Sequence, residues 1–390
     1  MDQAGAATRR EVSSLRATMA GLCAVLVGIG LARFAYTPLI PALIDAGWFT
    51  AAQAAYLAAA NLAGYLAGAL LARRMAAACS ASSALRAMMV LATATFFASA
   101  APVSFTWFFV WRFASGFAGG VLMALAAPAV LPHVPPARRG LAGGAIFTGV
   151  GLGIAASGTL VPLLLRFGLP VTWCGLGALA LLLTGLAWHG WPRDSTPSAA
   201  TPAVAPRTGR PLLALCVEYG LCAFGLVPHM VFLVVYVAHG LGQGLDAGAA
   251  YWVLFGLGAA FGPILAGRLA DRIGFGRALR LAFLIQTIAI TLAVLPGGAL
   301  ALALSSLVIG AAVPGVVPLV LGRVHDLVPA QQTQAAWSFT TEAFALGQAA
   351  GAYGLSWLFA RTDDYTLLFA LGAGAVLLAL LIDLIFARRG

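Results

Sequence analysis

The chain has 390 residues, of which 62% are hydrophobic and only 9% are charged. Soluble domains are about half apolar and about a quarter charged, so this composition excludes a water-soluble globular fold. The net charge of +10 comes from arginines that punctuate apolar runs and form no basic face, which argues against nucleic acid as a partner.

Apolar runs long enough to cross a membrane follow one another along nearly the whole chain. One helical span needs about 20 apolar residues for a hydrocarbon core of about 30 Å. Polar residues and Pro/Gly-rich breaks mark the ends of the runs. The predicted spans lie near residues 17–40, 52–71, 84–101, 105–127, 141–165, 170–188, 212–237, 249–267, 279–296, 299–320, 335–360 and 365–386.

A stretch rich in Pro, Ser, Thr and Arg separates the first six runs from the last six. It starts with Trp191-Pro-Arg-Asp-Ser-Thr-Pro-Ser and ends near Pro211. This composition is typical of a linker and does not cross a membrane. We therefore predict an N-terminal six-helix bundle over 1–190, a cytoplasmic linker over 191–211 and a C-terminal six-helix bundle over 212–390.

The arginines between the spans are distributed unevenly over the two membrane faces. Loops retained in the cytoplasm carry the positive excess. With the N-terminus inside, the outer loops hold only Arg166 and Arg361. We expect a multi-pass monomer in the lipid bilayer of the cytoplasmic (inner) membrane, with both termini cytoplasmic. The inner side then collects Arg73, Arg74, Arg138, Arg139, Arg193, Arg207, Arg210, Arg268, Arg272, Arg277, Arg323, Arg388 and Arg389.

The two halves of the chain repeat some of their residues. The second span ends in Gly68-Ala-Leu-Leu-Ala-Arg73 and the eighth in Gly267-Arg-Leu-Ala-Asp-Arg272. Gly116 and Gly120 of the fourth span have counterparts four residues apart in Gly310 and Pro314 of the tenth. Such internal symmetry is typical of transporters whose halves rock around a central site.

The loop after the eighth span carries a longer motif. Its sequence, Gly267-Arg-Leu-Ala-Asp-Arg-Ile-Gly-Phe-Gly-Arg277, resembles the G-x-L-x-D-R-x-G-R-[KR] signature of the major facilitator superfamily. The resemblance implies that Asp271 and nearby arginines form a latch that holds the halves together at the cytoplasmic face. The predicted gating loop comprises Gly267, Asp271, Arg272, Gly274 and Arg277. The first-half copy has Ala72 where the family expects Asp.

Two further segments resemble the same superfamily. Arg112-Phe-Ala-Ser-Gly116 is similar to its R-x-x-x-G motif, which is often connected with proton coupling, whereas the fifth span lacks the Gly-Pro pair of antiporters. The run Gly28-Ile-Gly-Leu-Ala-Arg-Phe-Ala-Tyr-Thr-Pro-Leu-Ile-Pro41 resembles the YbfB/YjiJ-type branch. The resemblance implies an all-α membrane fold of twelve transmembrane helices in two pseudo-symmetric six-helix bundles, working by alternating access.

Two arginines lie inside predicted spans, where a charge costs a few kcal/mol or more and therefore marks a functional candidate. Arg33 and Arg112 both fall about eight residues, or about 12 Å, from the outer ends of spans one and four. A guanidinium group suits a carboxylate or phosphate. We expect both to bind substrate, with Tyr36 beside them. The alternative is that they extend to the surface or bond carbonyls near the proline and glycine breaks of span one.

The C-terminal half also places ionisable residues inside spans. Glu218 in span seven and Glu342 in span eleven lie at similar depth. A carboxyl group in an apolar site can exchange protons near neutral pH, so both are predicted to couple transport to protons, or else to be structural and hydrogen-bonded. His229, beside Pro228, is a substrate-binding candidate whose alternative is a structural role at a helix break.

No phosphate loop, metal-ligand cluster or catalytic triad stands in a plausible setting, so we expect neither an enzyme nor a cofactor or metal. The favoured hypothesis is a proton-coupled secondary transporter of a small organic solute, and we expect this solute to be an anion. A proton-driven efflux permease for apolar or cationic compounds, with Glu218 and Glu342 as its site, stays open. A membrane sensor that does not transport is a third possibility.

Overall fold

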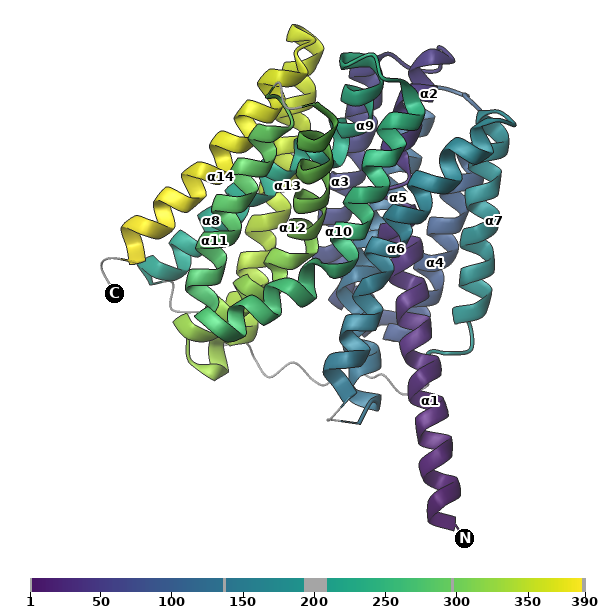
Figure 1. Cartoon of the computed structure of the whole chain (residues 1–390). Coiled ribbons are helices and arrows are strands. Elements are labelled where there is room, and N and C mark those ends of the chain that lie inside the picture. The colour runs from purple at the N-terminus through teal and green to yellow at the C-terminus, as the bar shows by residue number, and fades with distance from the viewer. Residues whose placement is uncertain (1, 136–137, 193–208, 296–297, 388–390) are drawn as a thin grey trace.

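The computed structural model describes residues 2–135, 138–192, 209–295 and 298–387, and these residues form a bundle of long helices (Figure 1). Residues 193–208, most of the predicted linker, lie outside the described residues. The predicted domain boundaries therefore stay predictions.

The long helices follow the predicted spans in order. The N-terminal half contains α1 (Asp2–Val25), η1 (Leu26–Leu31), α2 (Tyr36–Asp45), α3 (Ala51–Cys79), α4 (Ala81–Ala98), α5 (Phe105–Val130), η2 (Leu131–His133), α6 (Arg139–Leu165) and α7 (Leu169–Ala187). The C-terminal half contains α8 (Arg210–Val227), η4 (Pro228–Phe232), α9 (Leu233–Val235), η5 (Tyr236–Gly240), α10 (Gly244–Ile273), α11 (Phe275–Leu292), α12 (Gly298–Leu327), η6 (Ala330–Gln332), α13 (Thr333–Thr362) and α14 (Tyr365–Ala387).

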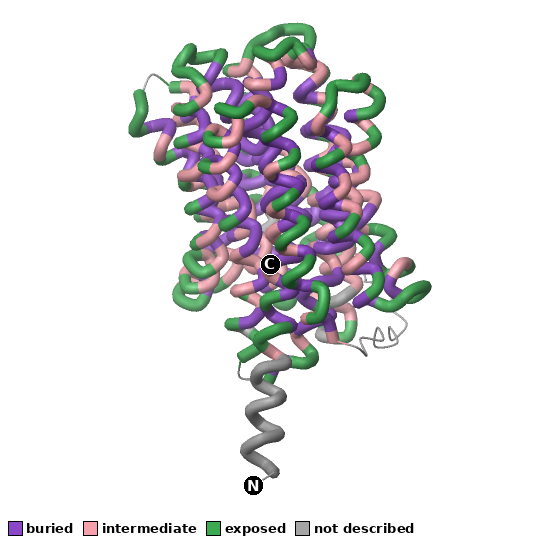
Figure 2. Tube along the Cα trace, turned by 90° about the vertical axis from the view of Figure 1, so that its right-hand side faces the viewer, coloured by how far each residue is buried: buried purple, intermediate pink, exposed green. Residues whose placement is uncertain are grey.

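Eleven of these helical segments, within the described residues, are long and apolar enough to cross a membrane. They confirm eleven predicted spans. The twelfth, α13, has 30 residues but carries more polar side chains, which lowers its hydropathy. It still packs lengthwise on α3 and α8, inside the same bundle. Figure 2 shows the buried chain segments concentrated along the middle of the bundle and the exposed ones at its ends and periphery.

Each half packs mainly on itself, and two helix pairs join the halves. In the first half α3 lies along α5, and in the second half α10 lies along α12. Across the halves α6 packs on α10 and α3 packs on α13. The Trp252 indole of α10 donates a hydrogen bond to the Ser157 hydroxyl of α6 at 3.1 Å. This hydrogen bond links α10 to α6 across the two halves.

Glycines allow the two internal pairs to approach backbone to backbone. A Cβ atom on Gly64, Gly68 or Gly116 would come within 1.8–2.1 Å of a carbonyl oxygen on the opposing helix of the α3–α5 pair. Gly258, Gly262 and Gly310 stand in the same relation within the α10–α12 pair, at 2.0 Å. Glycines four residues apart, such as Gly64 and Gly68, thus allow close helix packing.

These contacts also fix how the two halves correspond. Gly258, Gly262 and Gly310 each follow Gly64, Gly68 and Gly116 by 194 residues, which confirms the predicted match of Gly116 with Gly310. The predicted match of Gly68 with Gly267 is wrong by five residues, because Gly68 packs as Gly262 does.

The corrected register changes which residue replaces the aspartate of the latch in the first half. Ala77, not Ala72, occupies the position of Asp271, and both are exposed. Ser80 has the backbone conformation of Gly274, with φ, ψ of 73°, 150° and 84°, 154°. Ala72 is instead buried.

The first and seventh spans are interrupted at their centres. In the first span the wide helical turns of η1 are followed by turns over residues 32–35 before α2 begins. In the seventh span η4 begins at Pro228, and a second wide turn, η5, follows α9. Prolines and wide turns loosen the regular ladder of backbone hydrogen bonds, and such broken helices line the central sites of many transporters.

The halves meet closely on the face opposite the N-terminus. There α2 packs against η4, α9 and α10. The Thr37 hydroxyl donates to the Met230 carbonyl at 2.7 Å, and the His239 imidazole lies 3.1 Å from the Asp45 carboxylate. Phe34 packs against Trp252 and Phe255, with ring centroids 6.0 and 6.4 Å apart. The face opposite the N-terminus is therefore sealed by these contacts between the two halves.

Candidate functional site

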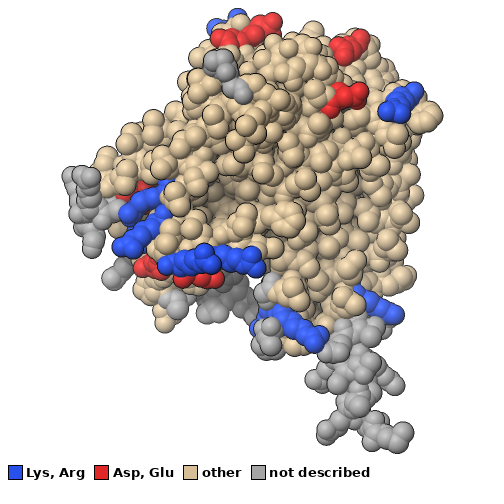
Figure 3. All heavy atoms as spheres, viewed as in Figure 1, with Lys and Arg blue, Asp and Glu red and all other residues tan. Residues whose placement is uncertain are grey.

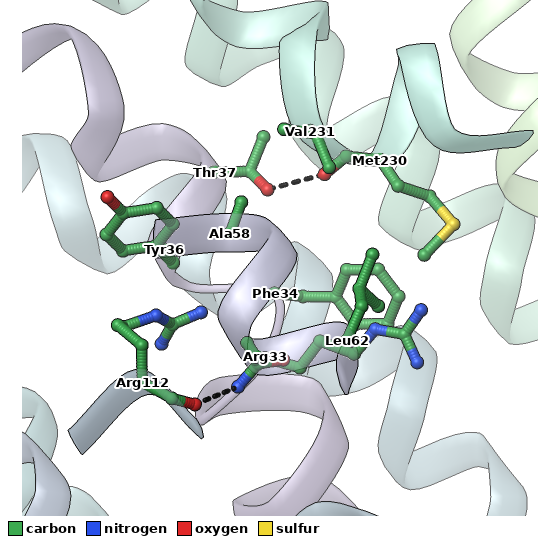
Figure 4. Close-up of a pocket in the computed structure, with 10 residues that line it drawn as sticks. Arg33, Phe34, Tyr36, Thr37, Ala58, Leu62, Arg112, Met230 and Val231 are labelled. Atoms are coloured by element: carbon green, nitrogen blue, oxygen red, sulfur yellow. Dashed lines mark hydrogen bonds between the residues drawn. The ribbon is translucent and has the colours of Figure 1, made fainter. Parts of the chain in front are cut away.

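A small pocket lies where the broken first span meets α3, α5 and the seventh span. Its cavity volume is about 20 Å³, room for about one water molecule and far below the ~300–1,000 Å³ common for ligand pockets, so the pocket is nearly closed in this structure. Figure 4 shows its side chains arranged around the turn between η1 and α2. Polar residues come from the N-terminal half, and the seventh span contributes apolar ones. The lining comprises Arg33, Phe34, Tyr36, Thr37, Ala58, Asn61, Leu62, Arg112, Met230 and Val231.

Arg33 enters this pocket without a polar partner. Its guanidinium carbon lies 5.1 Å from the centroid of the Phe34 ring and 5.0 Å from that of Tyr65. Its Nε is buried and, within the described residues, has no hydrogen-bond partner. No carboxylate of those residues lies within ion-pair distance of it. The charge of Arg33 is thus balanced only by the faces of two aromatic rings.

Arg112 lines the same pocket from α5 and is only 4% exposed. Its Nη1 donates to the Ala32 carbonyl at 2.9 Å, which the break in the first span leaves available to side chains. The guanidinium carbon sits 4.2 Å from the centroid of the Tyr36 ring, and Nε is buried without a partner. The predicted alternative, in which an arginine bonds a carbonyl at the helix break, therefore describes one of its contacts.

The two guanidinium groups share the pocket but point in different directions in Figure 4, one beside Tyr36 and one beside Phe34. Tyr36 is buried, lies in the pocket as predicted, and donates its hydroxyl hydrogen to the Ala54 carbonyl at 3.1 Å. Its phenol is thus committed to the protein and presents a ring to Arg112. The joint binding of one anion by both arginines stays a prediction.

Asn61 is a site residue that the sequence analysis missed. It lies on α3, is 1% exposed, and donates through Nδ2 to the Arg112 carbonyl and to Ser115 Oγ, each at 3.2 Å. Its Oδ1 is buried with no partner. The available signal was that Asn61 is the single asparagine of the chain and stands in the middle of an apolar span. Polar residues at that depth are rare and functional by default.

His229 is not brought to the pocket. It is fully buried, and its Nε2 lies 2.7 Å from Ser305 Oγ on α12. Its ring meets that of Phe369 edge to face at 5.0 Å. Its neighbours Met230 and Val231 line the pocket instead. These contacts match the structural alternative given above for His229.

Glu218 does not line the pocket of Arg33 and Arg112 and lies in a charged cluster of the C-terminal half. It is 2% exposed on α8, and the charges of Asp383, Arg323 and Arg280 act on its carboxyl group. Asp383 of α14 forms an ion pair with Arg280 of α11. The sequence analysis missed this pair, although an aspartate near the end of the otherwise apolar run of α14 was a visible signal.

Glu342 is exposed on α13, and no hydrogen bond or ion pair joins it to Glu218 within the described part of the chain. The two glutamates that the sequence grouped by depth are thus in different environments. Glu218 is buried near other charged groups, and Glu342 is exposed.

The gating-loop residues lie at the connection between α10 and α11. Gly274 has φ = 84°, a conformation that L-residues rarely adopt, so this turn favours a glycine. Asp271, Arg272 and Arg277 are exposed, and among the described residues none forms an ion pair. Gly267 faces open space. The latch predicted for this loop is therefore not engaged in this structure.

Residues 25–384 match the family model described as the uncharacterised MFS-type transporter YbfB. A comparison with curated proteins found no match. The matched region extends from the end of α1 to near the end of α14 and so includes the pocket, the broken spans and the loop at Gly274. The family model covers most of the chain, which confirms the resemblance expected from its motifs. The chain belongs to the YbfB-type family of major facilitator superfamily transporters.

Proposed function

We propose that this transporter carries a small organic anion across the cytoplasmic membrane by proton-coupled alternating access. The observation that carries the proposal is the pocket shared by Arg33 and Arg112. Neither arginine has a carboxylate within 4 Å among the described residues, and each has a buried Nε without a partner. Buried charges are normally paired, so a site with two unpaired cations favours an anionic ligand.

The side of the membrane from which the pocket is closed follows from the surface charges and from the contacts between the two halves. Most Lys and Arg groups visible in Figure 3 lie towards the N-terminal face, which supports a cytoplasmic location for that face. The seal made by Thr37, Met230, Asp45 and His239 then lies on the outer side. We assign this structure to a state closed to the outside, in which the exposed latch at Asp271 is released.

Proton coupling is assigned to Glu218 and not to the arginine pocket. Glu218 is buried near the Asp383–Arg280 pair, so a change in its protonation alters the charge balance between α8, α11 and α14. Moving these helices relative to one another is the kind of response that alternating access needs. Glu342, exposed and unpaired in the described residues, has less support for this role.

The first test of the anion site is a thermal-shift screen of purified protein against small carboxylates, inorganic phosphate, sugars and lipophilic cations. A ligand that binds only the folded protein raises its melting temperature. We expect a carboxylate to do so, and Arg33→Gln and Arg112→Gln to abolish the shift. Arg166 is exposed and does not line the pocket, so Arg166→Gln is the matched control and should leave the shift intact. Stabilisation by cations alone would support the efflux permease instead.

Coupling is then tested in proteoliposomes loaded with a pH-sensitive dye. An inward proton gradient should drive accumulation of the anion in the wild type. In Glu218→Gln we expect exchange of the anion without accumulation, because the protonatable group is lost while the arginine pocket remains. Glu342→Gln is the comparison variant and should still accumulate. Normal accumulation by Glu218→Gln would contradict this assignment.

A further inference from the structure

The side-chain amide of Asn61 has a fixed orientation. Its Nδ2 lies 3.2 Å from the Arg112 carbonyl oxygen, which can only accept hydrogen bonds. It lies equally far from Ser115 Oγ, whose own hydrogen is donated to the Ala32 carbonyl at 2.9 Å. Both neighbours therefore need a donor, and the NH₂ group must face them. The oxygen Oδ1 is left on the other side, buried and without a partner.

This unused acceptor lines the same pocket as the unused donors of Arg33. Tyr65 follows Asn61 by one turn on the same face of α3, and the Arg33 guanidinium packs on the Tyr65 ring. Arg33 makes no hydrogen bond in the described part of the chain, and Asn61 and Arg33 both line the pocket. A ligand that satisfies this site needs an anionic group for the arginine and, close to it, a hydrogen-bond donor for Asn61 Oδ1.

The donor is a hydroxyl and not an ammonium group. Two arginines without nearby carboxylates, Arg33 and Arg112, repel a second cation in a low-dielectric site. The remaining lining is apolar where the ligand's carbon chain would lie, at Ala58, Leu62 and Val231. The cavity of about 20 Å³ must widen to admit any ligand, which favours a short chain.

From this geometry we propose that the pocket selects small 2-hydroxy carboxylates, with Arg33 holding the carboxylate and Asn61 Oδ1 accepting the hydroxyl hydrogen. The inference rests on the proposed function, because it specifies the anion that the same site carries. Asn61 would be the residue that separates hydroxylated from plain carboxylates. A polar group built to pair with a ligand hydroxyl disfavours the analogue that lacks it, since the acceptor is then left buried and unpaired.

Matched ligand pairs test this proposal on the wild-type protein. Calorimetric titration would compare glycolate with acetate and lactate with propionate, with glycerol as the ligand that has hydroxyls but no carboxylate. We expect the hydroxylated member of each pair to bind about tenfold more tightly, and glycerol not to bind. Equal binding within both pairs, abolished by Arg33→Gln, would overturn the hydroxyl inference and leave the anion transporter standing. Absence of binding by all four carboxylates would count against both.

The variant Asn61→Leu assigns the preference to its residue. It should lose the preference for lactate over propionate, so that the ratio of the two dissociation constants falls to about one. Gln286→Leu removes another buried amide, on α11 and outside the pocket, and should keep the wild-type ratio. A preference that persists in Asn61→Leu would overturn the role of Asn61. If this variant does not fold, the wild-type ligand pairs still decide the proposal.

Discussion

The α3–α5 pair and the α10–α12 pair have the same backbone packing and different chemistry. Gly116 rests on the Asn61 carbonyl, and Gly310 rests in the same way on the Phe255 carbonyl. One turn earlier, Arg112 in the first pair corresponds to Ser306 in the second. The first pair thus presents a cation and an amide to the pocket, whereas the corresponding positions of the second pair, Ser306 and Phe255, do not line it. Small residues determine how the helices cross, and the chemistry of the site is placed on one half only.

The common packing is the feature with the largest expected effect. Gly116→Ala and Gly310→Ala both place a methyl group within 2.0 Å of an opposing carbonyl oxygen, which requires the helix backbones to separate. We expect each to lower the unfolding free energy by about 3 kcal/mol or more, enough to prevent recovery of folded protein. Size-exclusion profiles and melting temperatures in detergent measure this.

Glycines in the same molecule provide the control. Gly185→Ala and Gly374→Ala add the same methyl group where no heavy atom lies within 4 Å. They should fold and melt like the wild type. If Gly310→Ala is tolerated while Gly116→Ala is not, the two pairs are not equivalent and the register given above is wrong.

The different chemistry predicts the next largest effect. Arg112→Ser installs the residue found at the corresponding position of the C-terminal half and should lower kcat/KM for anion transport by at least about 100-fold, or about 3 kcal/mol. Ser306 has a buried hydroxyl without a partner, so Ser306→Ala should change transport less than about twofold and leave stability unchanged or slightly higher. Uptake into proteoliposomes, with both variants at equal density, tests the contrast. A comparable loss in both would place the site across the two halves.

Much of the fold follows from the apolar pattern of the sequence. Spans separated by arginines and Pro/Gly breaks have a strong signal, because each must satisfy its backbone hydrogen bonds within the helix. The register between the halves had no such support, because leucine, alanine and glycine recur at many spacings. The match of Gly68 with Gly267 was therefore an error that only the helix contacts corrected.

The site was predictable only where a residue is unusual for its position. Arg33, Tyr36 and Arg112 were found because charges are rare at that depth, and the structure places all three in one pocket. Depth does not determine direction around a helix, however. His229 turns towards Ser305, and Glu342 is exposed, although both lie in spans at plausible depth. Asn61 was missed because it carries no charge.

The connections between helices offer a smaller contrast between the halves. Ser80 has the positive φ that Gly274 has at the corresponding turn, and a serine is strained there. Ser80→Gly relieves that strain and loses a cap to the Ser83 amide worth a few tenths of a kcal/mol, so we expect a net gain of about 1 kcal/mol. Gly274→Ser should cost about 1–3 kcal/mol. Melting temperatures test both, with Gly276→Ala, which has no positive φ, as the neutral control.

The smallest expected effect concerns the seal between the halves on the face opposite the N-terminus. Thr37→Val removes the hydrogen bond to the Met230 carbonyl, which joins the two halves on this face. A net loss of about 0.5–1.5 kcal/mol shifts the population towards the state open on this face by about two- to tenfold. Nitroxide labels at Ala46→Cys and Gln243→Cys in a cysteine-free background would report a larger share of long distances.

Thr287→Val controls for the loss of a threonine hydroxyl, because Thr287 bonds only the Phe283 carbonyl of its own helix. It should leave the distance distribution unchanged. The Asp45–His239 contact is more exposed, with Asp45 68% accessible, so Asp45→Asn should shift the distribution less than Thr37→Val does. The opposite order would mean that the exposed ion pair, and not the buried contact of Thr37 with Met230, holds this face closed.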